Sequence, residues 1–274
     1  MSAWINGRRR NTLDHRDRGL QYGDGLFETM RIHRRRVRLL DYHLDRLFDG
    51  CRRLEIEAPV RASLRGELQR AASSRGEGIL KLLLTRGSGS RGYRPTGRER
   101  ATRILSTHAL PRRVWAQSAA PARVRICATP LSMNPRLAGL KSLNRLDSVL
   151  ARGEWRDERI WEGLMCDMDG SWVCGTMSNL FLRRGATLLT PLLDRCGVAG
   201  VMRRWVLENC AALRLRAEVR RIRFEDLKSA EEVFMSNAVI GIRSVRSIER
   251  AQAGSLRFAS VAAAARLRAL LEQL

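Results

Sequence analysis

Lys141 is one of only three lysines in a chain whose other basic residues are arginine. Of 51 lysine and arginine residues, only Lys81, Lys141 and Lys228 are lysine. A guanidinium stays protonated and cannot form a Schiff base, whereas an ε-amine can lose its proton in a desolvated pocket and attack a carbonyl. Lys141 follows a loop at 133–139 and precedes an apolar helical pattern, so its side chain is placed to point into a cleft. A surface lysine at a helix start is the more common reading of such a position, and neighbouring motifs must decide.

Three further stretches carry groups that suit an anion. A buried strand at 78–87 runs into a flexible loop with Arg91 and Tyr93, a cation and a phenol that suit a carboxylate. The glycine-bearing turn at 197–203 opens a helix, and backbone N–H groups at a helix start attract phosphate. His43 and Arg46 lie three residues apart on a predicted helix. Each feature also has an ordinary reading, as a surface loop, a common helix start or a solvated helix face.

Composition restricts the classes of partner. The formal net charge is +23, but arginine is spread through every segment and aromatic residues make up only 5%. Nucleic-acid sites concentrate charge and add aromatics, so specific nucleic-acid binding is disfavoured, while a positive field favours an anionic small-molecule substrate. No apolar run approaches the roughly 20 residues of a membrane span. Six cysteines without a C-x-x-C pair predict reduced thiols, no metal site and a cytoplasmic protein.

The pattern of strands and helices predicts a mixed α/β (α+β) chain of two domains. Strands are expected at 26–32, 78–87 and 101–109 and helices at 41–54 and 60–74, with Asp41 as the N-cap of the first helix. The glycine-punctuated stretch 17–25 is predicted to be a loop, and its three glycines indicate either a close approach of its backbone to another group or an ordinary loop. A polar, alanine-rich stretch then suggests a boundary. We therefore predict a small N-terminal α/β domain at 1–112, a linker at 113–122 and a larger C-terminal domain at 123–274.

Taken in order, the motifs of the chain resemble those of the fold-type IV pyridoxal-phosphate enzymes. The resemblance covers nearly the whole chain, and the R-G-S-G-x-R-G-Y, K-x-L-N-R-L and N-A motifs resemble the lyase branch of the family. The motifs are the segment from Arg18-Gly19 to Phe27, His43-x-x-Arg46-Leu47, Arg86 to Tyr93, Leu140-Lys141-Ser142-Leu143-Asn144-Arg145-Leu146, Ser178-Asn179-Leu180-Phe181, Gly197 to Arg203, and Ser236-Asn237-Ala238.

The resemblance implies a role for each candidate residue. Lys141 matches the lysine that holds pyridoxal 5'-phosphate covalently and later moves protons, which makes it the expected catalytic residue. Arg46 matches the arginine that binds the cofactor phosphate, and Arg91 the arginine that binds carboxylates in D-amino-acid relatives, with Tyr93 where those relatives carry a histidine. The other expected cofactor-binding residues are Cys174, Asn179, Gly200, Val201, Met202, Asn237 and Ala238.

Cys174 departs from the family pattern. Five residues before the asparagine of S-N-L-F, the family usually has a glutamate that keeps a proton on the pyridine nitrogen. A thiol is a poor anionic partner unless its pKa is strongly lowered, so the cofactor would be a weaker electron sink. We therefore hypothesise that Cys174 restricts the activity of the enzyme to elimination at the expense of transamination. The alternative is that it marks a relative with changed or lost activity.

The implied fold is the two-domain fold-type IV architecture, in which the larger domain has a mixed β-barrel-like sheet with helices and the cofactor lies between the domains. The implied activity is that of a homodimeric, cytoplasmic lyase that converts 4-amino-4-deoxychorismate to 4-aminobenzoate, a folate precursor, and pyruvate. The alternative within the family is a D-amino-acid or branched-chain aminotransferase. The alternative from another class is a basic nucleic-acid-binding protein that retains an old enzyme fold.

Overall fold

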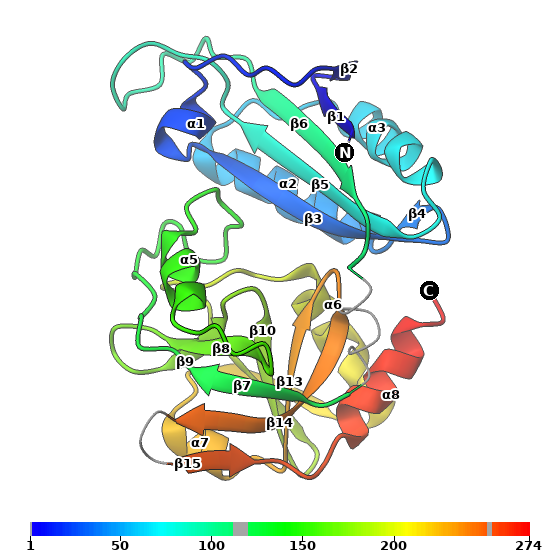
Figure 1. Cartoon of the computed structure of the whole chain (residues 1–274), viewed down its shortest axis with the longest axis vertical. Helices are drawn as coiled ribbons and strands as arrows, with labels where there is room; N and C mark the ends of the chain where they lie inside the picture. Colours follow the sequence, from blue (N-terminus) through cyan, green and yellow to red (C-terminus); the bar gives the residue numbers. More distant parts are fainter. Residues whose placement is uncertain (1, 112–119, 251–253) are drawn as a thin grey trace. The chain divides into compact units, whose positions relative to one another are not determined.

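A computed structural model describes residues 2–111, 120–250 and 254–274. The chain divides into two compact units, which are described separately below (Figure 1). Unit 1 comprises Met1–Pro111 together with Leu140–Asn144, and unit 2 comprises Arg112–Gly139 and Arg145–Leu274. Most of the predicted linker at 113–122 lies outside the described residues.

Unit 1 is built on an antiparallel sheet with helices packed on one face (Figure 1). The strand order among the described residues is β2-β1-β6-β5-β3-β4. The strands are β1 (Ser2–Ile5), β2 (Arg8–Arg9), β3 (Gly25–His33), β4 (Arg36–Val37), β5 (Gly78–Thr85) and β6 (Thr102–His108). The helices are α1 (Arg18–Tyr22), α2 (Leu40–Leu54) and α3 (Arg61–Ser73).

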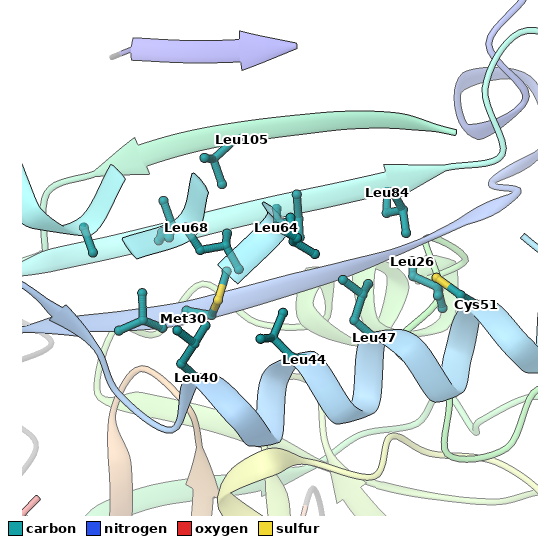
Figure 2. Packing of buried hydrophobic residues seen from close by; sticks show 14 of the residues in the cluster. Leu26, Met30, Leu40, Leu44, Leu47, Cys51, Leu64, Leu68, Leu84 and Leu105 are labelled. Carbon is teal, nitrogen blue, oxygen red and sulfur yellow. The ribbon is translucent and has the colours of Figure 1, made fainter. Parts of the chain in front are cut away.

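The core of unit 1 follows from two periodicities. On β3 every second residue faces the helices, which buries Leu26 and Met30 and also the polar Glu28. On α2 the buried positions recur every three or four residues, at Leu40, Leu44, Leu47 and Cys51 among others. Figure 2 shows these side chains between α2 and the strands, together with leucines from α3, β5 and β6.

Unit 2 contains a mixed sheet that closes on itself. Strands β10, β13, β14, β7, β8 and β9 follow one another, and β9 pairs back to β10 through Cys174 and Asn179. This closed ring confirms the predicted barrel-like sheet. The strands are β7 (Ala122–Ile126), β8 (Ile160–Cys166), β9 (Trp172–Gly175), β10 (Asn179–Arg184), β11 (Thr187–Pro191), β12 (Arg216–Arg220), β13 (Glu232–Asn237), β14 (Gly241–Arg250) and β15 (Gly254–Arg257).

Helices lie around this ring (Figure 1). They are α5 (Leu146–Gly153), α6 (Val201–Asn209), the 3-10 turn η1 (Cys210–Leu213), α7 (Phe224–Lys228) and α8 (Ala262–Leu271). The rings of Phe181 on β10 and Phe234 on β13 stack with their centres 4.9 Å apart. No helix among the described residues is long and apolar enough to span a bilayer.

Three local expectations differ from the structure. The stretch predicted as a glycine loop contains α1, because the Asp17 side chain accepts a hydrogen bond from the Gly19 N–H and caps a short helix. Asp41 is not the N-cap of α2; that position is Leu39, in the left-handed conformation with φ 55°. Leu140–Asn144 group with unit 1 rather than with the predicted domain at 123–274, because their backbone bonds to β3.

Candidate functional site

Lys141 is held in unit 1 by strand-like pairing with the start of β3. The Phe27 N–H donates to the Lys141 carbonyl at 3.0 Å, and the Leu143 N–H donates to the Gly25 carbonyl at 3.0 Å. The half-buried Lys141 places its Nζ 4.1 Å from the centre of the Phe27 ring. An aromatic face favours a nearby cation. The backbone of Lys141 is therefore fixed by β3, and its amine lies over the Phe27 ring, unlike the amine of a surface lysine.

The predicted close approach of the glycine loop is made to the same segment. Gly23 ends α1 with φ 66°, and a Cβ there would lie 2.6 Å from Oδ1 of Asn144. The Asn144 Nδ2 donates to the Gly23 carbonyl at 3.3 Å. Gly23 therefore lets the backbone of α1 meet the residues that follow Lys141.

Arg46, the predicted phosphate-binding residue, forms a buried ion pair in unit 1. Its Nε donates to Oε1 of Glu28 at 2.8 Å, and its Nη2 donates to Oε2. The same Oε2 lies 2.6 Å from Nδ1 of His43. Glu28 and His43 are 2% and 1% exposed, whereas Arg46 is half-buried, so the carboxylate and the imidazole are shielded from water while the guanidinium stays partly accessible. The sequence analysis noted His43 and Arg46 but not Glu28, which alternation on β3 directs toward α2.

Electrostatics keep this network charged at neutral pH. Burial alone would raise the pKa of Glu28, but Arg46 and His43 outweigh it and lower that pKa to about 2. Burial lowers the pKa of His43 despite the carboxylate beside it, with Lys141 among the cations that add to the shift. Glu28 is therefore ionised and His43 neutral near pH 7.

Replacement of Glu28 by glutamine is expected to make the free energy of unfolding depend less on pH below about pH 5. A carboxyl whose pKa falls from 4.5 unfolded to about 2 folded stabilises the protein fully above pH 4.5, and this contribution disappears as pH falls toward 2. Between pH 5 and pH 3 the wild type should lose about 2 kcal/mol more free energy of unfolding than Glu28→Gln. Urea unfolding at both pH values measures this. Substitution of the exposed Glu57 by glutamine should follow the wild type, and a parallel loss in Glu28→Gln would contradict the argument.

The predicted carboxylate-binding loop lies on the surface of unit 1. Arg91 is exposed, and Tyr93 is 84% exposed. The loop nevertheless has defined anchors: Gly92 and Gly87 adopt φ 92° and 95°, and a Cβ on Gly87 would lie 1.9 Å from the Arg100 carbonyl oxygen. The cation and the phenol are therefore displayed on a shaped loop.

In unit 2, the start of α6 has the properties of an anion cradle. Its N-cap is Gly200, no side chain of the described residues caps the helix, and its first turn contains no acidic residue. The first backbone bond of the helix runs from the Arg204 N–H to the Gly200 carbonyl, so the N–H groups of 201–203 precede the helical ladder. The side chains of Val201 and Met202 are buried, and their backbone amides are the groups offered to an anion.

Asn179 lies against this cradle. Its Nδ2 donates to the Val198 carbonyl at 2.8 Å, and a Cβ on Gly200 would lie 1.9 Å from its Oδ1. Only glycine therefore fits at Gly200. The uncapped helix start and this close approach together fit a cofactor with a phosphate group.

Asn237 ends β13, the strand beside Asn179, and Ala238 follows it in the turn. The register pairs Asn179 with Ser236, which brings the end of β13 to the start of β10. Oδ1 of Asn237 accepts hydrogen bonds from the Val239 N–H at 3.0 Å and the Ile240 N–H at 2.8 Å. The Asn237 side chain therefore shapes its own turn, and both residues are half-buried.

Cys174 lies on β9 directly opposite Asn179 and is 8% exposed. Burial, with Cys196 and Glu162 adding to it, raises the pKa of its thiol to about 12, and Arg145 opposes that shift only in part. The thiol is therefore neutral and does not fit the role of an anionic partner for a pyridine nitrogen.

Glu162 is the functional-site neighbour that the sequence analysis missed. It is fully buried on β8 and accepts hydrogen bonds from the backbone N–H groups of Gly163, Thr176 and Met177 at 3.0–3.2 Å. The hydroxyls of Thr176 and Ser178 donate to it at 2.5 and 2.7 Å. Glu162 thus shapes the turn that joins Cys174 to Asn179. A single acidic residue before a glycine gave no signal of this role.

Each unit thus gathers its own part of the predicted site. Unit 1 holds Lys141, Arg46, Arg91 and Tyr93, and unit 2 brings Cys174 and Asn179 together with the α6 start and the end of β13. Within 2–111, 120–250 and 254–274, no three or more His, Cys, Asp or Glu residues are grouped so that they could hold a metal ion.

Comparisons with known proteins agree over most of the chain. A family model described as amino-transferase class IV matches residues 25–248. An aminodeoxychorismate lyase from Vibrio harveyi is 32% identical over 246 residues, which are 89% of this chain and 90% of the relative. The crystal structure of 4-amino-4-deoxychorismate lyase from Pseudomonas aeruginosa is 42% identical, covers 99% of this chain and 98% of its own, and superposes with a TM-score of 0.90. A branched-chain amino acid aminotransferase from Escherichia coli shares the fold, with a TM-score of 0.85, 21% identity and coverage of 100% and 94%.

Proposed function

The chain belongs to the class IV aminotransferase family, and from this premise we propose that it is a pyridoxal-phosphate-dependent 4-amino-4-deoxychorismate lyase. The observation that carries the proposal is the likeness to lyases along the full chain, 42% identity to the Pseudomonas aeruginosa structure and 32% to the Vibrio harveyi relative. The products are pyruvate and 4-aminobenzoate, which serves folate synthesis.

The described residues suit this chemistry. In unit 1, Lys141 would hold the aldehyde of the cofactor and Arg46 offers a cation for its phosphate; in unit 2, the backbone at the α6 start offers N–H groups to a phosphate. When bound, pyridoxal phosphate supplies a conjugated ring that accepts the electron pair left by a departing proton. The Lys141 amine removes the proton from the carbon that bears the substrate nitrogen, and it returns a proton as the enolpyruvyl group leaves. Arg91 and Tyr93 bind a substrate carboxylate.

Product analysis with and without an α-keto acid tests the proposal. Purified protein loaded with pyridoxal phosphate and given 4-amino-4-deoxychorismate should release pyruvate and 4-aminobenzoate in equal amounts. The rate should not depend on an added α-keto acid, because elimination needs no amino acceptor. An aminotransferase needs the acceptor and releases no pyruvate from this substrate. Amino transfer without pyruvate release would therefore overturn the lyase assignment in favour of the aminotransferase.

Cys174 favours the lyase over its aminotransferase relatives. A buried neutral thiol cannot keep a proton on the pyridine nitrogen, and a neutral ring stabilises negative charge less. Transamination suffers more from this weakness than elimination does, because the lyase reaction ends in a stable aromatic product.

Replacement of Cys174 by glutamate is expected to raise transamination relative to pyruvate release. An anionic side chain at this position stabilises a ring proton, and a gain of about tenfold in the ratio of the two rates corresponds to roughly 1.4 kcal/mol. The transamination rate is measured with the same amino donor and the same keto acid in both proteins, and it is divided by the rate of pyruvate release from 4-amino-4-deoxychorismate. Cys174→Ser stays neutral and should keep the wild-type ratio. A wild-type enzyme that transaminates faster than it releases pyruvate would contradict the proposed role of Cys174.

The apolar face of α5 supports the proposal that the chain forms a homodimer. Leu146, Val149 and Leu150 occupy neighbouring positions on this helix and are 75%, 62% and 64% exposed. An exposed apolar stripe of this kind is typical of an interface. We expect light scattering to give about twice the chain mass of 31.1 kDa. Val149→Asp with Leu150→Asp should halve that mass, whereas Val60→Asp, at an isolated exposed valine, should not. An unchanged mass in the double variant would exclude α5 from the interface.

A cytoplasmic location is part of the same proposal. All six cysteines lie among the described residues as free thiols, as the sequence predicts, and reduced thiols are typical of the cytoplasm. The nucleic-acid-binding alternative has no comparable support, because the relatives that match the full chain are enzymes.

A further inference from the structure

Arg18 is a buried cation beneath an exposed loop. Its side chain is 3% exposed, and its guanidinium makes three hydrogen bonds in different directions. Nε donates to Oδ2 of Asp24 at 3.0 Å, Nη1 to the Gly92 carbonyl at 2.9 Å and Nη2 to the Tyr93 carbonyl at 2.7 Å. Two of its donor groups thus hold the far end of the loop that carries Arg91.

The near end of the same loop is held by the backbone around Arg18. The Arg18 N–H donates to the Gly87 carbonyl at 2.9 Å, and the Gly89 N–H donates to the Arg16 carbonyl at 3.3 Å. A Cβ on Gly89 would lie 3.0 Å from Cδ of Arg18, so glycine lets the loop rest on the arginine stem. Both ends of the loop that carries Arg91 are therefore attached to the short segment at 16–18.

Neighbouring groups fix the Arg18 guanidinium in turn. Asp24 also accepts hydrogen bonds from Nε of Arg86 at 2.7 Å and from Nη2 of Arg86 at 3.1 Å, so its carboxylate lies between two guanidinium groups. The guanidinium carbon of Arg18 is 4.9 Å from the centre of the Tyr22 ring. That ring meets the ring of Tyr93 edge-on, with 5.4 Å between centres. The Arg18 guanidinium is thus held by Asp24 and lies against the Tyr22 ring.

The chemistry of a buried guanidinium explains why the anchor is specific. Removing such a charge from water is costly unless its donors are satisfied. An arginine can serve a carboxylate and two carbonyls from one plane, whereas the ammonium of lysine is a point charge without that fork. Asp24 shares its single charge between Arg18 and Arg86, so the buried Arg18 guanidinium also needs the Gly92 and Tyr93 carbonyls as acceptors, and these contacts attach it to the loop.

We propose that Arg18 is a positioning residue that fixes the loop at 86–93 and thereby presents Arg91 to the carboxylate of the substrate. The inference rests on the proposed carboxylate-binding role of Arg91. The loop is ordered before substrate arrives, so the substrate does not have to order it on binding. Loss of Arg18 then weakens substrate binding without touching the chemical step.

Hydrogen exchange measures how firmly Arg18 holds the loop at 86–93, independently of enzyme activity. In Arg18→Ala, peptides that cover 86–98 should exchange about tenfold faster than in the wild type, because two charge-assisted bonds to the loop are gone. Arg18→Lys keeps the charge next to Asp24 and should give an intermediate rate, which protects the test if the alanine variant folds poorly. Arg16→Ala removes an exposed arginine of the same segment, paired with Asp14, and should stay within about twofold of the wild type. Unchanged loop exchange in both Arg18 variants would overturn the proposal.

Steady-state kinetics then test positioning. Arg18→Ala should raise KM for 4-amino-4-deoxychorismate about tenfold and leave kcat within about twofold, since only binding geometry is lost. Arg91→Ala should raise KM at least as much while loop exchange stays at the wild-type rate. A loosened loop with unchanged KM would overturn the positioning role. An unchanged KM in Arg91→Ala would overturn the Arg91 assignment itself, and the exchange data would distinguish that outcome from failure of Arg18 to hold the loop.

Discussion

Lys141→Ala is expected to reduce pyruvate release from 4-amino-4-deoxychorismate by at least about a thousandfold, because we propose that this one amine both holds the cofactor and moves the proton. Lys81, the other lysine of unit 1, lies with its Nζ 5.9 Å from the centre of the Phe27 ring, against 4.1 Å for Lys141. The rate of pyruvate formation at saturating substrate, with excess pyridoxal phosphate, measures the loss.

Lys228→Ala is the matched control for this experiment. Lys228 is a half-exposed lysine on α7 that pairs with Glu225, and its loss should leave the rate within about twofold. The fold should survive in Lys141→Ala, because the segment is held by backbone bonds from Lys141 and Leu143 to β3. A folded Lys141→Ala variant that retains a tenth of the wild-type rate would show that the amine is not the proton carrier.

Glu162→Ala is expected to lower the free energy of unfolding by about 3–5 kcal/mol. The carboxylate accepts hydrogen bonds from three backbone N–H groups and two hydroxyls. The Thr176 N–H also donates to the Gly163 carbonyl at 3.1 Å, so the change removes the carboxylate acceptor of the Gly163 and Met177 N–H groups and of the Thr176 and Ser178 hydroxyls. Burial raises the pKa of Glu162, and these hydrogen bonds oppose that shift. Urea unfolding at neutral pH measures the effect.

The same change should also disturb the start of β10, because the turn that Glu162 binds leads directly into Asn179, a residue proposed to bind the cofactor. As a control, Glu225→Ala changes a side chain that is 75% exposed and should stay within about 0.5 kcal/mol of the wild type. A loss below about 1 kcal/mol in Glu162→Ala would show that water or rearranged donors replace the carboxylate, and the turn would not depend on it.

Local patterns were sufficient to predict most of the elements. The Asn6-Gly7 and Asp169-Gly170 pairs are typical two-residue hairpin turns, and in the structure they join β1 to β2 and β8 to β9. The apolar run at 78–87 predicts β5, and the three-and-four spacing of leucines predicts α2. These features depend on neighbours within a few residues, which is why the sequence contains them in readable form.

Buried charges could not be predicted in the same way. Glu28 meets Arg46 across 18 residues, and Arg18 meets Gly92 across 74, so neither pairing leaves a local pattern. Glu162 binds a turn 14 residues further along. The grouping of Leu140–Asn144 with unit 1 depends likewise on backbone bonds to β3, which only the folded chain reveals.

Parts of the candidate site could be predicted because a few residues differ from the rest of the chain. A lysine in an arginine-rich chain and an uncapped glycine start of a helix are each weak signals, and the resemblance to a family gave them roles. The structure places Lys141 on the Phe27 ring and Asn179 against Gly200. What the resemblance could not supply was the surroundings of Cys174, where burial keeps the thiol neutral.

The most direct measurement is the position of the covalent cofactor adduct after borohydride reduction of the purified protein with pyridoxal phosphate. Proteolysis and mass spectrometry then have only Lys81, Lys141 and Lys228 as side-chain amines to distinguish. The adduct is expected on Lys141 alone, and Lys141→Ala should carry none. An adduct on Lys81 or Lys228, or no adduct on a folded wild-type protein, would contradict the assignment of Lys141 as the residue that holds the cofactor.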